Sequence, residues 1–113
     1  MGKNKYKLKN DAGKNELLKA LEDLRNFSQN EIPFKHITQI AALAGIEYLV
    51  KDKRGRGSQE RFAHHLLNNY QGYNGHVGIH VIHKGGDQIL VRKSDYKKYI
   101  YHIFKLIIEK TIK

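Results

Sequence analysis

Cysteine is absent from the 113-residue sequence. That absence excludes a disulfide framework, thiolate ligands for zinc and a cysteine nucleophile. The sequence also lacks any run of about eighteen apolar residues, so we expect no membrane-spanning helix. The lysines near the N-terminus are not followed by an apolar segment, which argues against a secretory signal. Together these absences predict a cytoplasmic protein that does not enter a membrane.

Acidic residues are scarce, with 11 Asp and Glu against 21 Lys and Arg, which gives a formal net charge of +10. Such an imbalance is typical of proteins with a polyanionic partner, and RNA or DNA is the first candidate. An anionic membrane surface is less favoured, because no basic amphipathic helix carries bulky apolar residues that a core would not bury. Hydrophobic residues make up 40% of the chain, which is enough for a core in one domain of this length.

The pattern along the chain predicts a loose basic arm over residues 1–13 and one α+β domain over residues 14–113. Apolar residues at helical spacing indicate helices, and alternation indicates strands. We expect a three- or four-stranded antiparallel sheet with helices packed on one face, plus an extra N-terminal helix. The expected helices are Lys14–Phe27, Pro33–Ala44 with a C-cap at Gly45, and a last helix capped by Ser94 or Asp95 with Tyr96, Tyr99, Ile100, Ile103 and Ile107 facing the core; the expected strands are Ile46–Lys51, Glu60–His65, Val77–His83 and Gln88–Val91.

Basic residues gather in two places, the segment Lys51–Arg61 and the start of the last helix. Cations are mildly unfavourable at a helix N-terminus, and a bound phosphate would relieve that conflict. Glycines in the first cluster would let the backbone approach a phosphate, but no Gly-Lys-Ser/Thr follows them, so we expect no nucleotide cofactor. The alternative is that both clusters are solvated loops. The expected nucleic-acid contacts are Lys53, Arg54, Arg56, Ser58, Gln59, Arg61, Lys93 and Lys97.

Seven histidines are many for this length, and their spacing argues against a metal site. His76 and His80 lie about 13 Å apart along one strand face, so they cannot share an ion. His64 and His65 should point to opposite faces. Alternation places His65, His80 and Arg61 on the exposed face, where imidazole could exchange a proton with a ribose hydroxyl. His80 and His65 are therefore the candidate catalytic residues. The alternative is that both are surface histidines with no role in catalysis.

A set of short motifs from Gly45 onward resembles the HicA family of toxin proteins, over about two-thirds of the chain and with a core at residues 33–110. The motifs are a helix ending at Ala44-Gly45, a strand, a basic turn with Gly57-Ser58, Phe62 closely followed by His64, an alternating strand ending in His83, a glycine pair, and a helix with Tyr99-Ile100, Ile103 and Leu106. The resemblance implies a fold similar to double-stranded-RNA-binding domains, cleavage of messenger RNA, and a protein antitoxin that covers the site.

The sequence departs from that family where its catalytic histidine normally follows the Gly-Ser pair, because Gln59 stands there. Glutamine has no proton to exchange at neutral pH, so the family's mechanism cannot be carried over intact. His65 lies about 20 Å further along a strand, whereas His80 from a neighbouring strand could take that place. The N-terminal helix, Lys14–Phe27, is outside the family's short form. The sequence thus predicts an RNA-binding domain and, as a further hypothesis, an endoribonuclease.

Two other functions fit parts of the sequence. Residues Ile37–Ile46 look like the first helix and turn of a helix-turn-helix, which would make the protein a DNA-binding regulator. That reading requires a recognition helix over Glu47–Ser58, a segment that contains two glycines and several β-formers. The other alternative is a non-catalytic basic module that binds an acidic protein.

Overall fold

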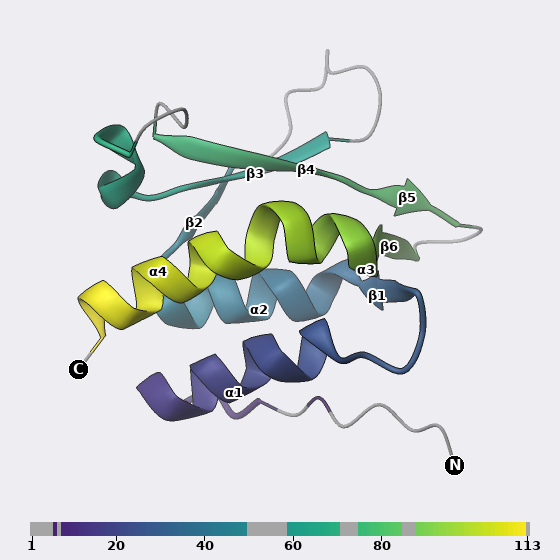
Figure 1. The fold of residues 1–113 in the computed structure, drawn as a ribbon, viewed down its shortest axis with the longest axis horizontal. Coiled ribbons are helices and arrows are strands. Elements are labelled where there is room, and N and C mark those ends of the chain that lie inside the picture. The colour runs from purple at the N-terminus through teal and green to yellow at the C-terminus, as the bar shows by residue number, and fades with distance from the viewer. Residues whose placement is uncertain (1–5, 7, 50–58, 71–74, 85–87, 113) are drawn as a thin grey trace.

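A computed structural model describes residues 6, 8–49, 59–70, 75–84 and 88–112. Figure 1 shows three layers: a sheet, then α2 and α4 beneath it, then α1 on the far side of those helices. The elements are α1 (Lys14–Arg25), β1 (Glu31–Pro33), α2 (Phe34–Ala44), β2 (Glu47–Leu49), β3 (Gln59–Ala63), the 3₁₀ helix η1 (His65–Asn68), β4 (His76–His80), β5 (Ile82–His83), β6 (Ile89–Arg92), α3 (Lys93–Asp95), the π-helical turn η2 (Tyr96–Ile100) and α4 (Tyr101–Thr111).

The predicted α+β class, the antiparallel pairing and the extra N-terminal helix are confirmed, and the arrangement is consistent with a fold like that of double-stranded-RNA-binding domains. The strands form two three-stranded sheets, β1-β6-β5 and β2-β3-β4, instead of one sheet of three or four strands. Only Val81 separates β4 from β5, so a single stretch of chain belongs to both sheets.

Strand β1 was not expected, because Pro33 was placed in the first turn of a helix. Pro33 is instead the last residue of β1, where it pairs with Leu90 of β6, and α2 begins at the next residue. Proline tolerates this position because β1 lies at the edge of its sheet, where one side of the strand needs no ladder hydrogen bond. The other end of α2 follows the prediction: Gly45 adopts φ 78°, and the Ile46 amide donates back to Ala41 O at 2.8 Å.

The last helix starts at Lys93, and neither Ser94 nor Asp95 caps it as predicted. The chain passes from β6 straight into the helix, and the Lys93 amide donates to Asn30 O at 2.8 Å. Tyr99, predicted to face the core, is 42% exposed. A π turn closes over five residues instead of four, so Tyr99 rotates away from the core while Ile100 stays buried.

Strand β3 ends at Ala63, two residues earlier than predicted, and the chain then turns into η1. Alternation no longer applies beyond Ala63, so the expectation that His64 and His65 point to opposite faces is wrong. Their rings stack with centroids 4.4 Å apart. The His64 Nδ1 accepts a hydrogen bond from the Leu66 amide at 3.1 Å and thereby caps η1.

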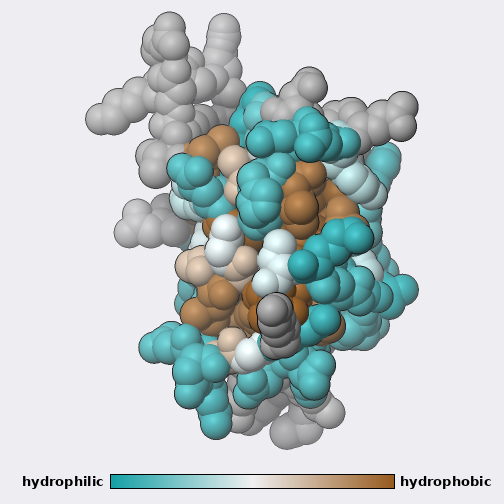
Figure 2. All heavy atoms as spheres, turned by 90° about the vertical axis from the view of Figure 1, so that its left-hand side faces the viewer, coloured by the Kyte–Doolittle hydropathy of each residue, from teal (hydrophilic) through white to brown (hydrophobic). Residues whose placement is uncertain are grey.

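Aromatic rings join the sheet to the helices. Phe62 on β3 meets Phe104 on α4 edge-on with centroids 5.2 Å apart, and it lies 5.9 Å from Phe34 on α2. All three side chains are buried. Figure 2 views the end of the molecule where α4 finishes and shows hydrophobic surface in separate patches bordered by hydrophilic side chains. Most large apolar side chains of the described residues are buried between the layers.

The described part of the predicted loose arm is packed against the domain. The ring of Tyr6 lies tilted against that of His36 with centroids 4.2 Å apart, and its hydroxyl donates to Gln39 Oε1 at 3.0 Å. The Gln39 amide in turn donates to Leu8 O at 3.2 Å. Tyrosine and leucine set between lysines give this segment apolar groups to bury, which a purely basic tail would lack.

Candidate functional site

The outer face of the sheet β2-β3-β4 carries the predicted catalytic and phosphate-binding side chains Arg61 and His80, which are both exposed. Their neighbours Phe62 and Ile79 are buried on the inner face, as alternation requires. Gly78 lies directly opposite Arg61 and presents no side chain. Arg61 and His80 are therefore diagonal neighbours across β3 and β4, at about 7–8 Å between Cβ atoms.

His80 occupies the junction between the two sheets. It pairs with Gln59 in the β3–β4 register, so the structure places an imidazole opposite the glutamine. Continuing the register of Ile82 with Leu90 by two residues in each strand brings Arg92 level with His80. A hollow of about 280 Å³ is lined by His80, Arg92 and Asp95, together with Val81 and Ile82.

A second hollow of about 410 Å³, which Glu31 also lines, continues from the same arginine along the start of the last helix. Arg92 lines both hollows, and Lys97 and Ser94 line this one. Among the described residues, neither Arg92 nor Lys97 forms an ion pair, so both cations can meet a phosphate. The ammonium of Lys93, another predicted nucleic-acid contact, donates one hydrogen bond to Phe27 O at 2.8 Å and tethers the loop before β1.

The structure does not bring His65 to His80. Gln59 pairs with His80 and Ala63 with His76, so His65, which follows Ala63, lies at the opposite end of the strand pair. The separation along the strands is about 13 Å or more. His65 shares a different hollow with His64 and Glu47. Burial, and then the neighbouring His65, lower the pKa of His64.

Four of the predicted contact residues, Lys53, Arg54, Arg56 and Ser58, lie outside the described residues, and Gln59 is placed by its backbone alone. The sequence does not indicate Asp95 as a site residue, because its position predicts a helix cap. Arg92 belongs to the basic cluster at the start of the last helix, and no local pattern connects it with His80. The signal that joins them is the β5–β6 register, which short strands around a glycine pair do not reveal in sequence.

Other site types are not supported by what the structure describes. No group of three His, Cys, Asp or Glu side chains among these residues could hold a metal ion. No helix in the described ranges is long and apolar enough to cross a membrane. Glu47–Leu49, which should open the recognition helix of a helix-turn-helix, forms strand β2 instead.

No family model matches the chain, and no curated protein and no solved structure matches it significantly. The candidate site consists of His80, Asp95, Arg92 and Arg61, with Lys97 further along the helix.

Proposed function

We propose that the protein is an RNA-binding domain of HicA type that cleaves RNA on the outer sheet face, with His80 as its general base. The observation that carries the proposal is the exposed His80, which lines one hollow with Arg92 and Asp95 and lies diagonally across the sheet from Arg61. An imidazole between two guanidinium groups matches the needs of a phosphodiester that carries a ribose 2′-hydroxyl. Gln59, at the family's catalytic position, can offer hydrogen bonds but no proton transfer.

In this proposal His80 removes the proton from the 2′-hydroxyl, and the 2′-oxygen attacks phosphorus. The bond from phosphorus to the 5′-oxygen breaks, which leaves a 2′,3′-cyclic phosphate and a 5′-hydroxyl end. The imidazolium returns the proton to the leaving oxygen, so no cofactor or metal is required. Arg92 and Arg61 stabilise the charge that develops on the phosphate, because guanidinium groups fork hydrogen bonds to such oxygens. Asp95, in the same hollow, orients the imidazole as a positioning residue.

The resemblance to HicA toxins extends the proposal to a protein antitoxin and a cytoplasmic location. An antitoxin would act by covering the outer sheet face, because that face carries His80 and Arg61. A DNA-binding role of the helix-turn-helix kind is less favoured, since Glu47–Leu49 forms strand β2 where the recognition helix would begin.

Cleavage of a mixed messenger RNA pool by the pure protein tests the catalytic assignment. We expect His80→Ala to reduce the cleavage rate roughly 100-fold or more with little change in RNA affinity, as is typical for loss of a general base. His83→Ala is the matched control, because His83 is also exposed but lies on β5 outside the hollow. Unchanged cleavage by His80→Ala would show that another group is the base.

Salt-dependent RNA binding tests the phosphate contacts separately. We expect Arg92→Ala to weaken binding across sequences and to reduce the slope of log affinity against log salt by about 1, because one phosphate contact is lost. Lys110→Ala, an exposed cation at the end of α4, should leave that slope unchanged. If the protein neither cleaves nor binds RNA at low salt, the proposed function is wrong.

A further inference from the structure

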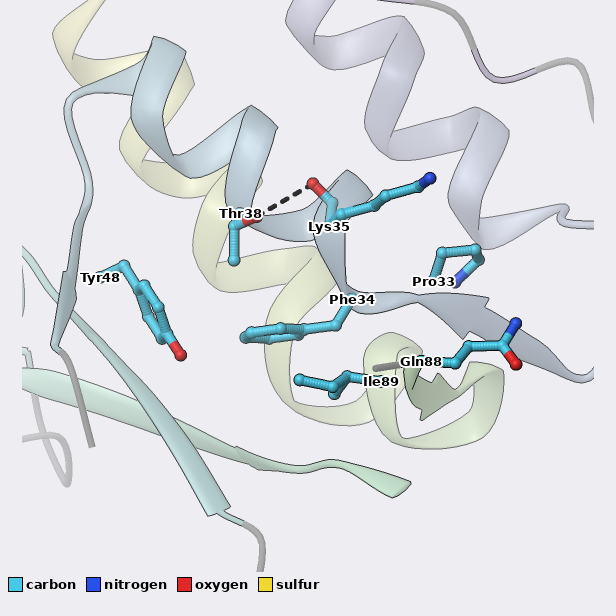
Figure 3. Close-up of a pocket in the computed structure, with 7 residues that line it drawn as sticks. All are labelled: Pro33, Phe34, Lys35, Thr38, Tyr48, Gln88 and Ile89. Atoms are coloured by element: carbon cyan, nitrogen blue, oxygen red, sulfur yellow. Dashed lines mark hydrogen bonds between the residues drawn. The ribbon is translucent and has the colours of Figure 1, made fainter. Parts of the chain in front are cut away.

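An aromatic hollow of about 410 Å³ lies away from the residues of the proposed reaction. Figure 3 shows the rings of Phe34 and Tyr48 and the side chain of Ile89 bordering it, from α2, β2 and β6 respectively. Pro33, Thr38 and Gln88 also line it, as does Lys35, whose exposed side chain extends away from the rings of Phe34 and Tyr48 in Figure 3. A volume of this size falls within the range of pockets that hold small organic groups.

The ring of Tyr48 is partly exposed and is fixed in place by two contacts. It is 37% exposed, so part of the ring is open to a ligand. Its hydroxyl donates to Oε1 of the buried Glu60 at 2.6 Å, and its ring meets Phe34 edge-on with centroids 5.7 Å apart. Burial and the bond to Glu60 raise the pKa of Tyr48 to about 12, so the hydroxyl keeps its proton at neutral pH. A rigid, partly exposed ring provides contact area at little entropic cost.

The exposed ring in the hollow and the charge of the whole chain favour a ligand with both a flat ring and negative charge. The partly exposed Tyr48 ring can stack on a flat ring. The chain's net charge of +10 opposes cationic ligands and attracts polyanions. A nucleotide combines these properties, and its base can enter such a hollow only when it is not paired, because paired bases remain stacked in the duplex.

We infer that the hollow between Phe34, Tyr48 and Ile89 binds one unpaired nucleobase of a single-stranded RNA held by the protein. This inference rests on the proposed RNA-binding function and sharpens its substrate class. RNA reaches the hollow as a flexible single strand, so a perfect duplex of the same sequence binds more weakly.

Binding of short oligoribonucleotides tests the inference, with a series in which each position in turn lacks its base. In the wild type we expect one abasic position to weaken binding roughly 5- to 150-fold, the range measured for loss of a single base stack. In two variants the abasic position should no longer weaken binding. Their affinity for the intact strand should fall by about as much as the abasic position lowers that of the wild type. Tyr48→Leu removes the stacking ring, and Thr38→Phe fills the hollow while it leaves Tyr48 and the core in place. The second variant keeps the test decisive if the first folds poorly.

Tyr99→Leu is the matched control, because Tyr99 is an exposed tyrosine, 42% accessible, that does not line the hollow. Loss of affinity in both hollow variants but not in the control supports the inference. If the hollow variants bind RNA as tightly as the wild type, the inference is wrong but RNA binding itself stands. The same conclusion holds if Tyr99→Leu loses as much affinity as the hollow variants. If the wild type binds none of the strands, the proposed function and this inference both fall.

Discussion

The hydrogen bond between Tyr48 and Glu60 permits a prediction whose size follows from burial. Glu60 is 5% exposed and lies opposite Ile79 on the inner face of β3, and no described cation forms an ion pair with it. The Tyr48 hydroxyl at 2.6 Å is its side-chain partner. Tyr48→Phe removes that donor and leaves the buried Glu60 side chain without a hydrogen bond from any described side chain. Hydrogen bonds to charged groups contribute about 1.5–3 kcal/mol, so we expect the free energy of unfolding to fall by about 2 kcal/mol.

Urea unfolding followed by circular dichroism measures that loss. An unchanged slope of the unfolding free energy against urea concentration would show that only the stability has altered. In a domain of this size the loss corresponds to about 10 °C in the thermal midpoint. Glu60→Gln supplies the comparison, because its neutral amide oxygen can accept the same bond. In that background Tyr48→Phe should cost about 1 kcal/mol, the usual value for a neutral pair. A loss below about 0.5 kcal/mol, or equal losses in both backgrounds, would refute a buried charge held by this hydroxyl.

Two further predictions concern the helical layers. Tyr96→Phe should lower the free energy of unfolding by about 1 kcal/mol, since the fully buried Tyr96 donates to Leu21 O at 2.7 Å and joins η2 to α1; an unchanged urea midpoint would contradict this. Burial, and then Lys35, lower the pKa of His36 from its ordinary 6.5, so the unfolded chain binds the proton more readily and stability should fall as the pH drops below about 6.5. Thermal midpoints at pH 7.5 and 5.5 should differ less in His36→Gln than in the wild type, and an equal difference would refute the contribution of His36.

Most elements could be predicted from the sequence because their signals are local. The helical spacing of Leu17, Leu21 and Leu24 defines α1, and Gly45 marks the end of α2. Strand β1 could not be predicted in this way. It has three residues, it contains a proline, and it exists because Ile32 pairs with Val91 almost sixty positions later. Such a strand is stabilised by its partner and not by its own propensity.

The candidate site could be predicted only in part, for the same reason. Alternation correctly exposes His80 and Arg61, because each lies in a strand whose inner face is buried. Alternation fails for His65, since the strand ends before that residue is reached. The meeting of His80 with Arg92 and Asp95 depends on how two distant segments pair, and no local pattern carries that information.

The position of Arg92 is fixed by the connection between β5 and β6. Ile82 pairs with Leu90 and His83 with Ile89, so the number of residues in that connection decides which residue of β6 comes level with His80. The last helix begins immediately after Arg92, at Lys93, so its first turn must reach the same place. A shift of one residue in the register would turn Arg92 to the other face of its strand and carry the helix start away from the imidazole. The junction of the two sheets therefore brings an imidazole, a guanidinium and a carboxylate to one hollow, although His80 and Arg92 are twelve positions apart in the chain.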